Sequence, residues 1–161
     1  MLPGLLLALL LVGVADFARP SIALPSANSH QTVPPSPPSR AEGVAIHEGQ
    51  AGRILYTLRD GKLHEGQAGA ILYTVRNGRV MKGQSGTILF TVRGGKVHEG
   101  QSGPIRFTIR NGKVHEGQDG KVLFTISGNS IREGQGGKIL NTWKGRLDES
   151  TLALLVWLKM Q

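Results

Sequence analysis

The central part of the chain alternates between apolar and polar positions in short runs that are separated by glycine-containing turns. One pair of runs is IRFTIR, residues 105–110, followed by KVHE, residues 113–116. Alternation with a period of two is typical of a β-strand with one buried face. Asn111-Gly112 lies between the two runs and is a strong signal for a two-residue hairpin turn. The pattern therefore predicts a β-hairpin in which Arg110 pairs with Lys113.

This hairpin recurs six times with a period of seventeen residues, so that the repeats occupy residues 46–147. A Gly-Gln pair marks each copy, at Gly49-Gln50, Gly66-Gln67, Gly83-Gln84, Gly100-Gln101, Gly117-Gln118 and Gly134-Gln135. An open twelve-strand meander would leave its apolar face and two strand edges exposed. We therefore expect an all-β fold in which six hairpins form a closed or flattened barrel or ring. The alternative is a solenoid with one coil per repeat, but Asn-Gly turns join antiparallel neighbours.

The predicted register divides each hairpin into two faces. In the hairpin 105–116 the core face carries Ile105, Phe107, Ile109 and Val114, with Glu116 at its edge. The other face carries one threonine per repeat, which we expect to face solvent: Thr57, Thr74, Thr91, Thr108, Thr125 and Thr142. Five leucines fall on the same face and are expected to form an external apolar girdle: Leu55, Leu72, Leu89, Leu123 and Leu140.

The two ends of the chain differ from the repeats. Residues 1–23 resemble a signal peptide, with an apolar run at 5–14 and cleavage expected between 15 and 27, although no Lys or Arg precedes the run. Residues 24–43 form a Pro-rich linker that is expected to be disordered. A secreted or periplasmic location follows from these two segments. Residues 148–161 combine a helix-capping start at Asp148 with an apolar run at 152–158, which predicts a short helix that caps the ring or docks on a partner or membrane.

The basic residues of the repeats are the most informative feature for function. Residues 46–147 contain sixteen Lys and Arg against seven Asp and Glu, a net charge of +9. The predicted pairing sets like charges opposite one another at the hairpin tips: Arg59 and Lys62, Arg76 and Arg79, Arg93 and Lys96, Arg110 and Lys113. These eight residues either extend into water or bind an anionic polysaccharide or another anionic envelope component. Nucleic acid is a weak candidate, because the pattern provides no aromatic platform for bases.

The glutamines of the Gly-Gln-x-Gly turns have two interpretations. Their side-chain amides could satisfy backbone groups of the turns, which is a structural role. Alternatively, Gln50, Gln67, Gln84, Gln101, Gln118 and Gln135 could bind sugar hydroxyls, as in a multivalent lectin. The turns contain no aromatic residue that could stack on a sugar ring, which disfavours the second interpretation.

Catalysis and metal binding find little support in the sequence. His-Glu pairs recur at 47–48, 64–65, 98–99 and 115–116, but adjacent strand residues point to opposite faces and cannot share a metal ion. The chain has no cysteine, which excludes disulfides and thiolate sites. Near-identical repeats also offer no unique nucleophile with its base. We expect a non-enzymatic protein without a cofactor that acts as a binding or structural module at the cell envelope.

The short hairpins, the aromatic-x-aliphatic strands and the Asn-Gly-Lys turns resemble the bacterial four-fold beta-flower domains and related short-repeat β proteins. The resemblance covers only the repeat array and rests on the style of the repeat. It implies a β-hairpin repeat fold, and it assigns no catalytic residue to any position of this chain.

Overall fold

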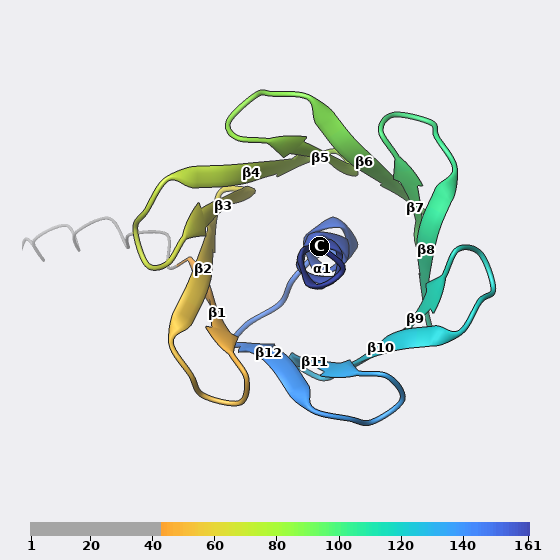
Figure 1. Cartoon of the computed structure of the whole chain (residues 1–161). Coiled ribbons are helices and arrows are strands. Elements are labelled where there is room, and N and C mark those ends of the chain that lie inside the picture. Colours follow the sequence, from red (N-terminus) through yellow and green to blue (C-terminus); the bar gives the residue numbers. More distant parts are fainter. Residues whose placement is uncertain (1–42) are drawn as a thin grey trace, which may run out of the picture. The chain divides into compact units, whose positions relative to one another are not determined.

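A computed structural model describes residues 43–161 of the chain. The predicted signal peptide and all of the linker except Gly43 lie outside the described residues. Twelve antiparallel strands follow one another around a closed barrel, in which the last strand is hydrogen-bonded to the first (Figure 1). The strands are β1 (Val44–Glu48), β2 (Ile54–Arg59), β3 (Lys62–Glu65), β4 (Ile71–Arg76), β5 (Arg79–Lys82), β6 (Ile88–Arg93), β7 (Lys96–Glu99), β8 (Ile105–Arg110), β9 (Lys113–Glu116), β10 (Val122–Ser127), β11 (Ser130–Glu133) and β12 (Ile139–Trp143). The predicted all-β closed fold is thus confirmed.

Tight turns at one end of the barrel set the register of the hairpins. Asp60, Asn77 and Asn111 adopt φ values of 49°, 50° and 51°, and each is followed by a glycine that also has positive φ. Two consecutive residues with positive φ match the twist of the flanking strands. In the hairpin β8–β9 the Cα partners are Arg110 and Lys113, Ile109 and Val114, Thr108 and His115, and Phe107 and Glu116. These are the pairs that the sequence predicts.

Six five-residue connections join the hairpins at the other end of the barrel and project outward from its wall (Figure 1). We call the first four residues of each connection an outer loop: residues 49–52, 66–69, 83–86, 100–103, 117–120 and 134–137. In the loop 100–103 the Gly103 N–H donates to the Glu99 carbonyl at 2.8 Å, and the Glu99 N–H donates to the Pro104 carbonyl at 3.0 Å. A Cβ on Gly103 would lie 2.5 Å from that Glu99 oxygen, so this position requires glycine.

Helix α1 (Glu149–Lys159) lies inside the barrel, surrounded by the strands (Figure 1). The Asp148 side chain caps it by accepting a hydrogen bond from the Thr151 N–H at 3.2 Å, as the sequence predicts. The expectation that this helix closes one end of the ring is wrong in its placement. A barrel of twelve strands is too wide for its own side chains to fill, and an apolar helix fills it instead. Within residues 43–161, no helix combines the length and apolar character needed to span a membrane.

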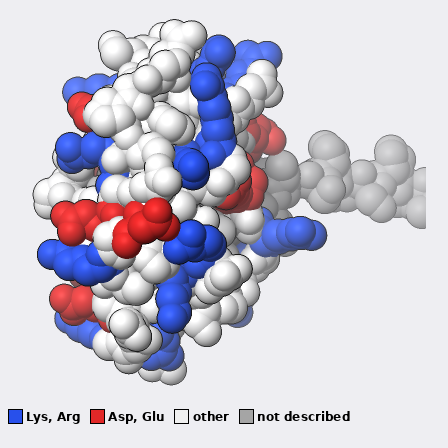
Figure 2. Space-filling view, turned by 90° about the vertical axis from the view of Figure 1, so that its right-hand side faces the viewer, with Lys and Arg blue, Asp and Glu red and all other residues white. Residues whose placement is uncertain are grey.

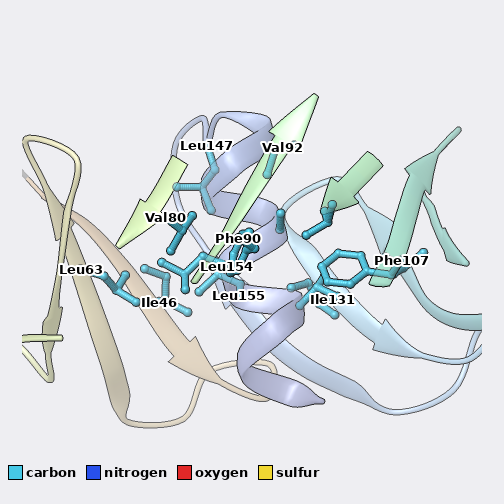
Figure 3. Packing of buried hydrophobic residues seen from close by; sticks show 14 of the residues in the cluster. Ile46, Leu63, Val80, Phe90, Val92, Phe107, Ile131, Leu147, Leu154 and Leu155 are labelled. Carbon is cyan, nitrogen blue, oxygen red and sulfur yellow. The ribbon is translucent and has the colours of Figure 1, made fainter. Parts of the chain in front are cut away.

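The core is a layer of side chains around this helix. Each short strand contributes one side chain with no exposed surface: Ile46, Leu63, Val80, Val97, Val114 and Ile131. All six belong to one core cluster with Leu154 and Leu155 of α1, and Figure 3 shows Ile46, Leu63, Val80 and Ile131 beside these two leucines. The aromatic Trp157 packs edge-on against Tyr73, with ring centroids 5.9 Å apart, and also contacts Phe90. Burial of these apolar groups is the main stabilising contribution to the fold.

Two expectations about the outer face are wrong in part, the first for four threonines and the second for two leucines. Thr57, Thr74, Thr91 and Thr108 do not face solvent but are only 3–8% exposed. Leu89 and Leu140 do not form an external girdle, since they pack against the core cluster. The leucine positions coincide with β-bulges, as at Leu123, where β10 shifts register against β9 between Val122 and Phe124. A bulge inserts an unpaired residue and redirects its side chain, which simple alternation does not predict.

Candidate anion-binding surface

The eight predicted cations lie on the outer face of the barrel, next to the tight turns. We call them the basic belt: Arg59, Lys62, Arg76, Arg79, Arg93, Lys96, Arg110 and Lys113. Each of the strands β2 to β9 contributes one of them. Within a hairpin the two cations are Cα partners, as are Arg76 and Arg79. Between hairpins the cations are not Cα partners. Lys62 of β3 pairs with Thr74 of β4, which is two residues before Arg76.

Three arginines of the belt turn back along the wall and hold the outer loops. The Arg59 Nη2 donates to the Gln67 carbonyl at 3.0 Å, and the Arg93 Nη2 donates to the Gln101 carbonyl at 3.4 Å. Arg110 forms an ion pair of 3.1 Å with Asp119. Each guanidinium thus moves away from the opposed lysine, which reduces the like-charge repulsion between them.

The other five cations of the belt have no internal acceptor. Within residues 43–161, no hydrogen bond or ion pair is formed by the side chains of Lys62, Arg76, Arg79, Lys96 and Lys113. Figure 2 shows Lys and Arg side chains distributed over one face of the barrel, with Asp and Glu between them. The belt is therefore defined by strand position, one cation beside a tight turn on each of β2 to β9, and other basic and acidic residues share the same surface.

Threonine hydroxyls hold the outer loops against the wall. The Thr57 Oγ1 donates to the Gly66 carbonyl at 2.7 Å, and equivalent bonds recur in every repeat. The Thr142 Oγ1 donates to the Gly49 carbonyl at 3.0 Å, so the sixth repeat is joined to the first in the same way. Thr57, Thr74, Thr91 and Thr108 are buried beneath the loops to which they donate.

The glutamine side chains do not close the loops. All six are exposed, and none of their amides forms a hydrogen bond within the described part of the chain. Their backbone carbonyls are the groups that accept, as Gln84 does from Thr74 at 3.1 Å. The predicted structural role of the amide groups is therefore wrong. Backbone hydrogen bonds, threonine hydroxyl groups and arginine side chains hold the loops instead.

Four histidine side chains also form hydrogen bonds to the outer loops. The Nδ1 atoms of His47, His64, His98 and His115 lie 2.9–3.1 Å from the carbonyl of the last glycine of their own loops. Only a protonated Nδ1 can donate to a carbonyl, so this contact fixes the tautomer of the neutral ring. The paired glutamates point to the rim of the barrel, where Glu48 contacts Arg53 at 3.0 Å. Among residues 43–161, no three His, Asp or Glu side chains are placed to hold a metal ion.

Comparison with known proteins supports the repeat architecture. Residues 39–105 match the family of 6-fold beta flower proteins. This is a β-hairpin repeat family, of the same kind as the four-fold domains that the repeat style resembles, and its symmetry number agrees with the six hairpins of the barrel. Neither the curated proteins nor the solved structures contain a match to the chain.

Sequence reasoning found the belt but missed what three of its members do. The signal was present, because the strands β2, β4, β6 and β8 all end in Thr-x-Arg and each of these segments precedes a Gly-Gln pair by a constant distance. A constant offset between a donor and a glycine-rich turn indicates a contact between them. The offset does not show which face of the barrel wall the loop covers.

Proposed function

We propose that this protein is a non-enzymatic, exported binding module of the cell envelope whose basic belt holds an anionic polysaccharide. The continuity of the belt carries the proposal, because the eight consecutive strands β2 to β9 each contribute one cation to the outer face. The Cβ atoms of neighbouring belt residues are about 5 Å apart within a hairpin and about 7–8 Å apart between hairpins. A linear polymer with repeated acidic groups can contact several of them at once.

The five belt cations without an internal acceptor are the expected contacts. An ammonium or guanidinium group that has no partner in the protein keeps its capacity to donate to a carboxylate or sulfate group. The braced arginines add positive potential, and they hold the outer loops beside the belt. The binding surface is therefore a rigid wall, which limits the entropy lost on binding.

The predicted export of the protein supports an acidic polysaccharide as the partner. The apolar run at residues 5–14 and the Pro-rich segment after it are typical of a secreted or periplasmic protein with a tether. Acidic polysaccharides are abundant outside the cytoplasm, whereas nucleic acid is rarely met there. The proposal involves no cofactor, and no reaction is assigned to the belt.

The test is retention on immobilised heparin, used as a model anionic polysaccharide. A variant with serine at the five free belt positions removes Lys62, Arg76, Arg79, Lys96 and Lys113. Serine suits these sites because the chain itself has Ser127 and Ser130 at the equivalent positions of β10 and β11. We expect the natural protein to elute at increasing salt and the variant to pass through, since charge contacts on a surface are screened by salt.

A second variant with the same change in net charge is the control. It replaces five cations outside the belt by serine: Lys82, Lys121, Lys138, Lys144 and Arg146. Retention of this control with loss of the belt variant supports the proposal. An equal loss of retention in both variants would show that net charge and not the belt determines binding, and full retention of the belt variant would contradict the proposal.

The outer loops support a second candidate function, the binding of neutral sugars. The observation in its favour is that six exposed glutamine amides have no partner within residues 43–161. Replacement of Gln67, Gln84, Gln101 and Gln118 by Ala should then abolish retention on a neutral glycan array without lowering the melting temperature. Retention of glycans by the alanine variant would eliminate this candidate.

A further inference from the structure

A cavity opens beside the end of α1, at the end of the barrel opposite the basic belt. Its volume is about 490 Å³, and it lies between the last turn of the helix and the strands β9 to β12. The helix approaches β5 and β6 most closely and packs Trp157 against Tyr73 and Phe90 on that side. A cavity of about 260 Å³ also borders Trp157 on the side of β6 to β8, whereas the cavity of about 490 Å³ lies on the side of the helix away from this contact.

Four of the seven residues that line this cavity are apolar. Leu123, Phe124 and Leu140 contribute from the barrel, and Met160 contributes from the helix end. Leu123 is the residue that the β-bulge of β10 inserts, so the bulge brings it to the mouth of the barrel. Cavities of 300–1,000 Å³ with apolar walls and a few polar groups are typical of small-molecule sites.

Three charged groups line the cavity: Glu116, Glu133 and Lys159. Glu116 is already paired with Lys121 at 3.7 Å. Glu133 and Lys159 form no ion pair within the described residues 43–161. One carboxylate and one ammonium group thus remain without a protein partner on the edge of an apolar space.

The surroundings of Lys159 favour an anion beside it. Burial lowers the pKa of this lysine, and the Glu48 carboxylate offsets part of the effect. Glu48 is itself paired with Arg53 at 3.0 Å and forms no ion pair with the lysine. A bound carboxylate would stabilise the charged ammonium group that burial disfavours.

We propose that this cavity binds a small zwitterion with apolar side chains, of the size of a dipeptide. Its ammonium group would contact Glu133, its carboxylate would contact Lys159, and its side chains would pack on Leu123, Leu140 and Met160. Each free charge of the cavity then meets the opposite charge of the ligand, and the apolar walls are covered.

Isothermal titration of the purified protein with the dipeptide leucyl-leucine tests the proposal. The N-acetyl dipeptide lacks the ammonium charge and the dipeptide amide lacks the carboxylate, and each should bind about tenfold more weakly than the free dipeptide. Glycyl-glycine retains both charges but lacks the apolar side chains and should not bind measurably. No heat with leucyl-leucine, or equal affinity of the blocked forms, would overturn the proposal.

Variants locate the site. Glu133→Gln and Lys159→Met should each weaken leucyl-leucine binding about tenfold. Glu65→Gln is the matched control, since Glu65 occupies the equivalent rim position of another repeat and lines a different cavity. Equal weakening by the control would place the binding elsewhere and overturn the proposal. The five-serine belt variant should bind the dipeptide normally, which separates this site from the anion-binding surface.

Discussion

The hydroxyl group of Thr108 donates a 2.8 Å hydrogen bond to the carbonyl of Gly117, which belongs to the outer loop that covers it. Thr108 is 5% exposed, so the loop has removed the hydroxyl from water. Thr108→Val keeps the shape of the side chain but leaves the carbonyl without its donor. We expect a loss of about 1–2 kcal/mol in the free energy of unfolding. Urea titration measures it, and the exposed Thr87→Val is the control that should change by less than about 0.5 kcal/mol.

Two adjacent glycines of the outer loop 134–137 should respond oppositely to alanine. A Cβ on Gly137 would lie 2.8 Å from the Glu133 carbonyl oxygen, whereas a Cβ on Gly136 would have no neighbour within 4 Å. Gly137→Ala should therefore cost about 1–3 kcal/mol of stability. Gly136→Ala should be neutral or slightly stabilising, because it restricts the unfolded chain. Similar melting temperatures for the two variants would contradict the loop geometry.

The helix inside the barrel should be essential for stability. Trp157 links it to the wall through Tyr73 and Phe90 at centroid distances of 5.9 Å. Trp157→Ala removes both contacts and leaves a void, which should destabilise the protein by about 2–4 kcal/mol. Thermal unfolding followed by circular dichroism measures the loss. Gln161→Ala changes an exposed residue at the end of the chain and should leave the melting temperature unchanged. An unchanged melting temperature in Trp157→Ala would mean that the helix is not held in the barrel.

Alkaline pH should destabilise the protein through Tyr56. Burial, aided by Tyr73 and Glu65, raises the pKa of this tyrosine above its usual value of 10.0. The unfolded chain then loses the phenolic proton before the folded protein does, so stability falls as the pH rises above about 10. Tyr56→Phe removes this contribution and should lose less stability than the natural protein between about pH 9 and about pH 11. Urea titrations of both proteins at the two pH values measure the free energy of unfolding. An equal loss of this free energy in both proteins would exclude Tyr56 as the cause. The lowered pKa of Lys159 acts in the opposite direction but is common to both proteins.

The sequence by itself determined the local structure of the repeats. The pairing of Arg110 with Lys113 follows from Asn111-Gly112, because a two-residue turn with positive φ leaves only one register. The apolar run at 152–158 and the Asp148 cap located the helix for a similar reason, since both signals lie within a few residues. Six equal repeats with one apolar face also required closure of the sheet.

Only the tertiary structure decided where these elements lie relative to one another. The helix fills the barrel because closure of twelve strands creates an apolar space that no single hairpin contains. Thr108 is buried because the loop of the following repeat folds over it, and Arg110 turns from its opposed lysine because Asp119 comes within 3.1 Å. The cavity beside Lys159 exists because the barrel brings β9 to β12 beside the last turn of the helix. Local patterns fix the turns and the alternation of faces, whereas burial and charge pairing depend on which other repeat, loop or helix the closed barrel brings to each face.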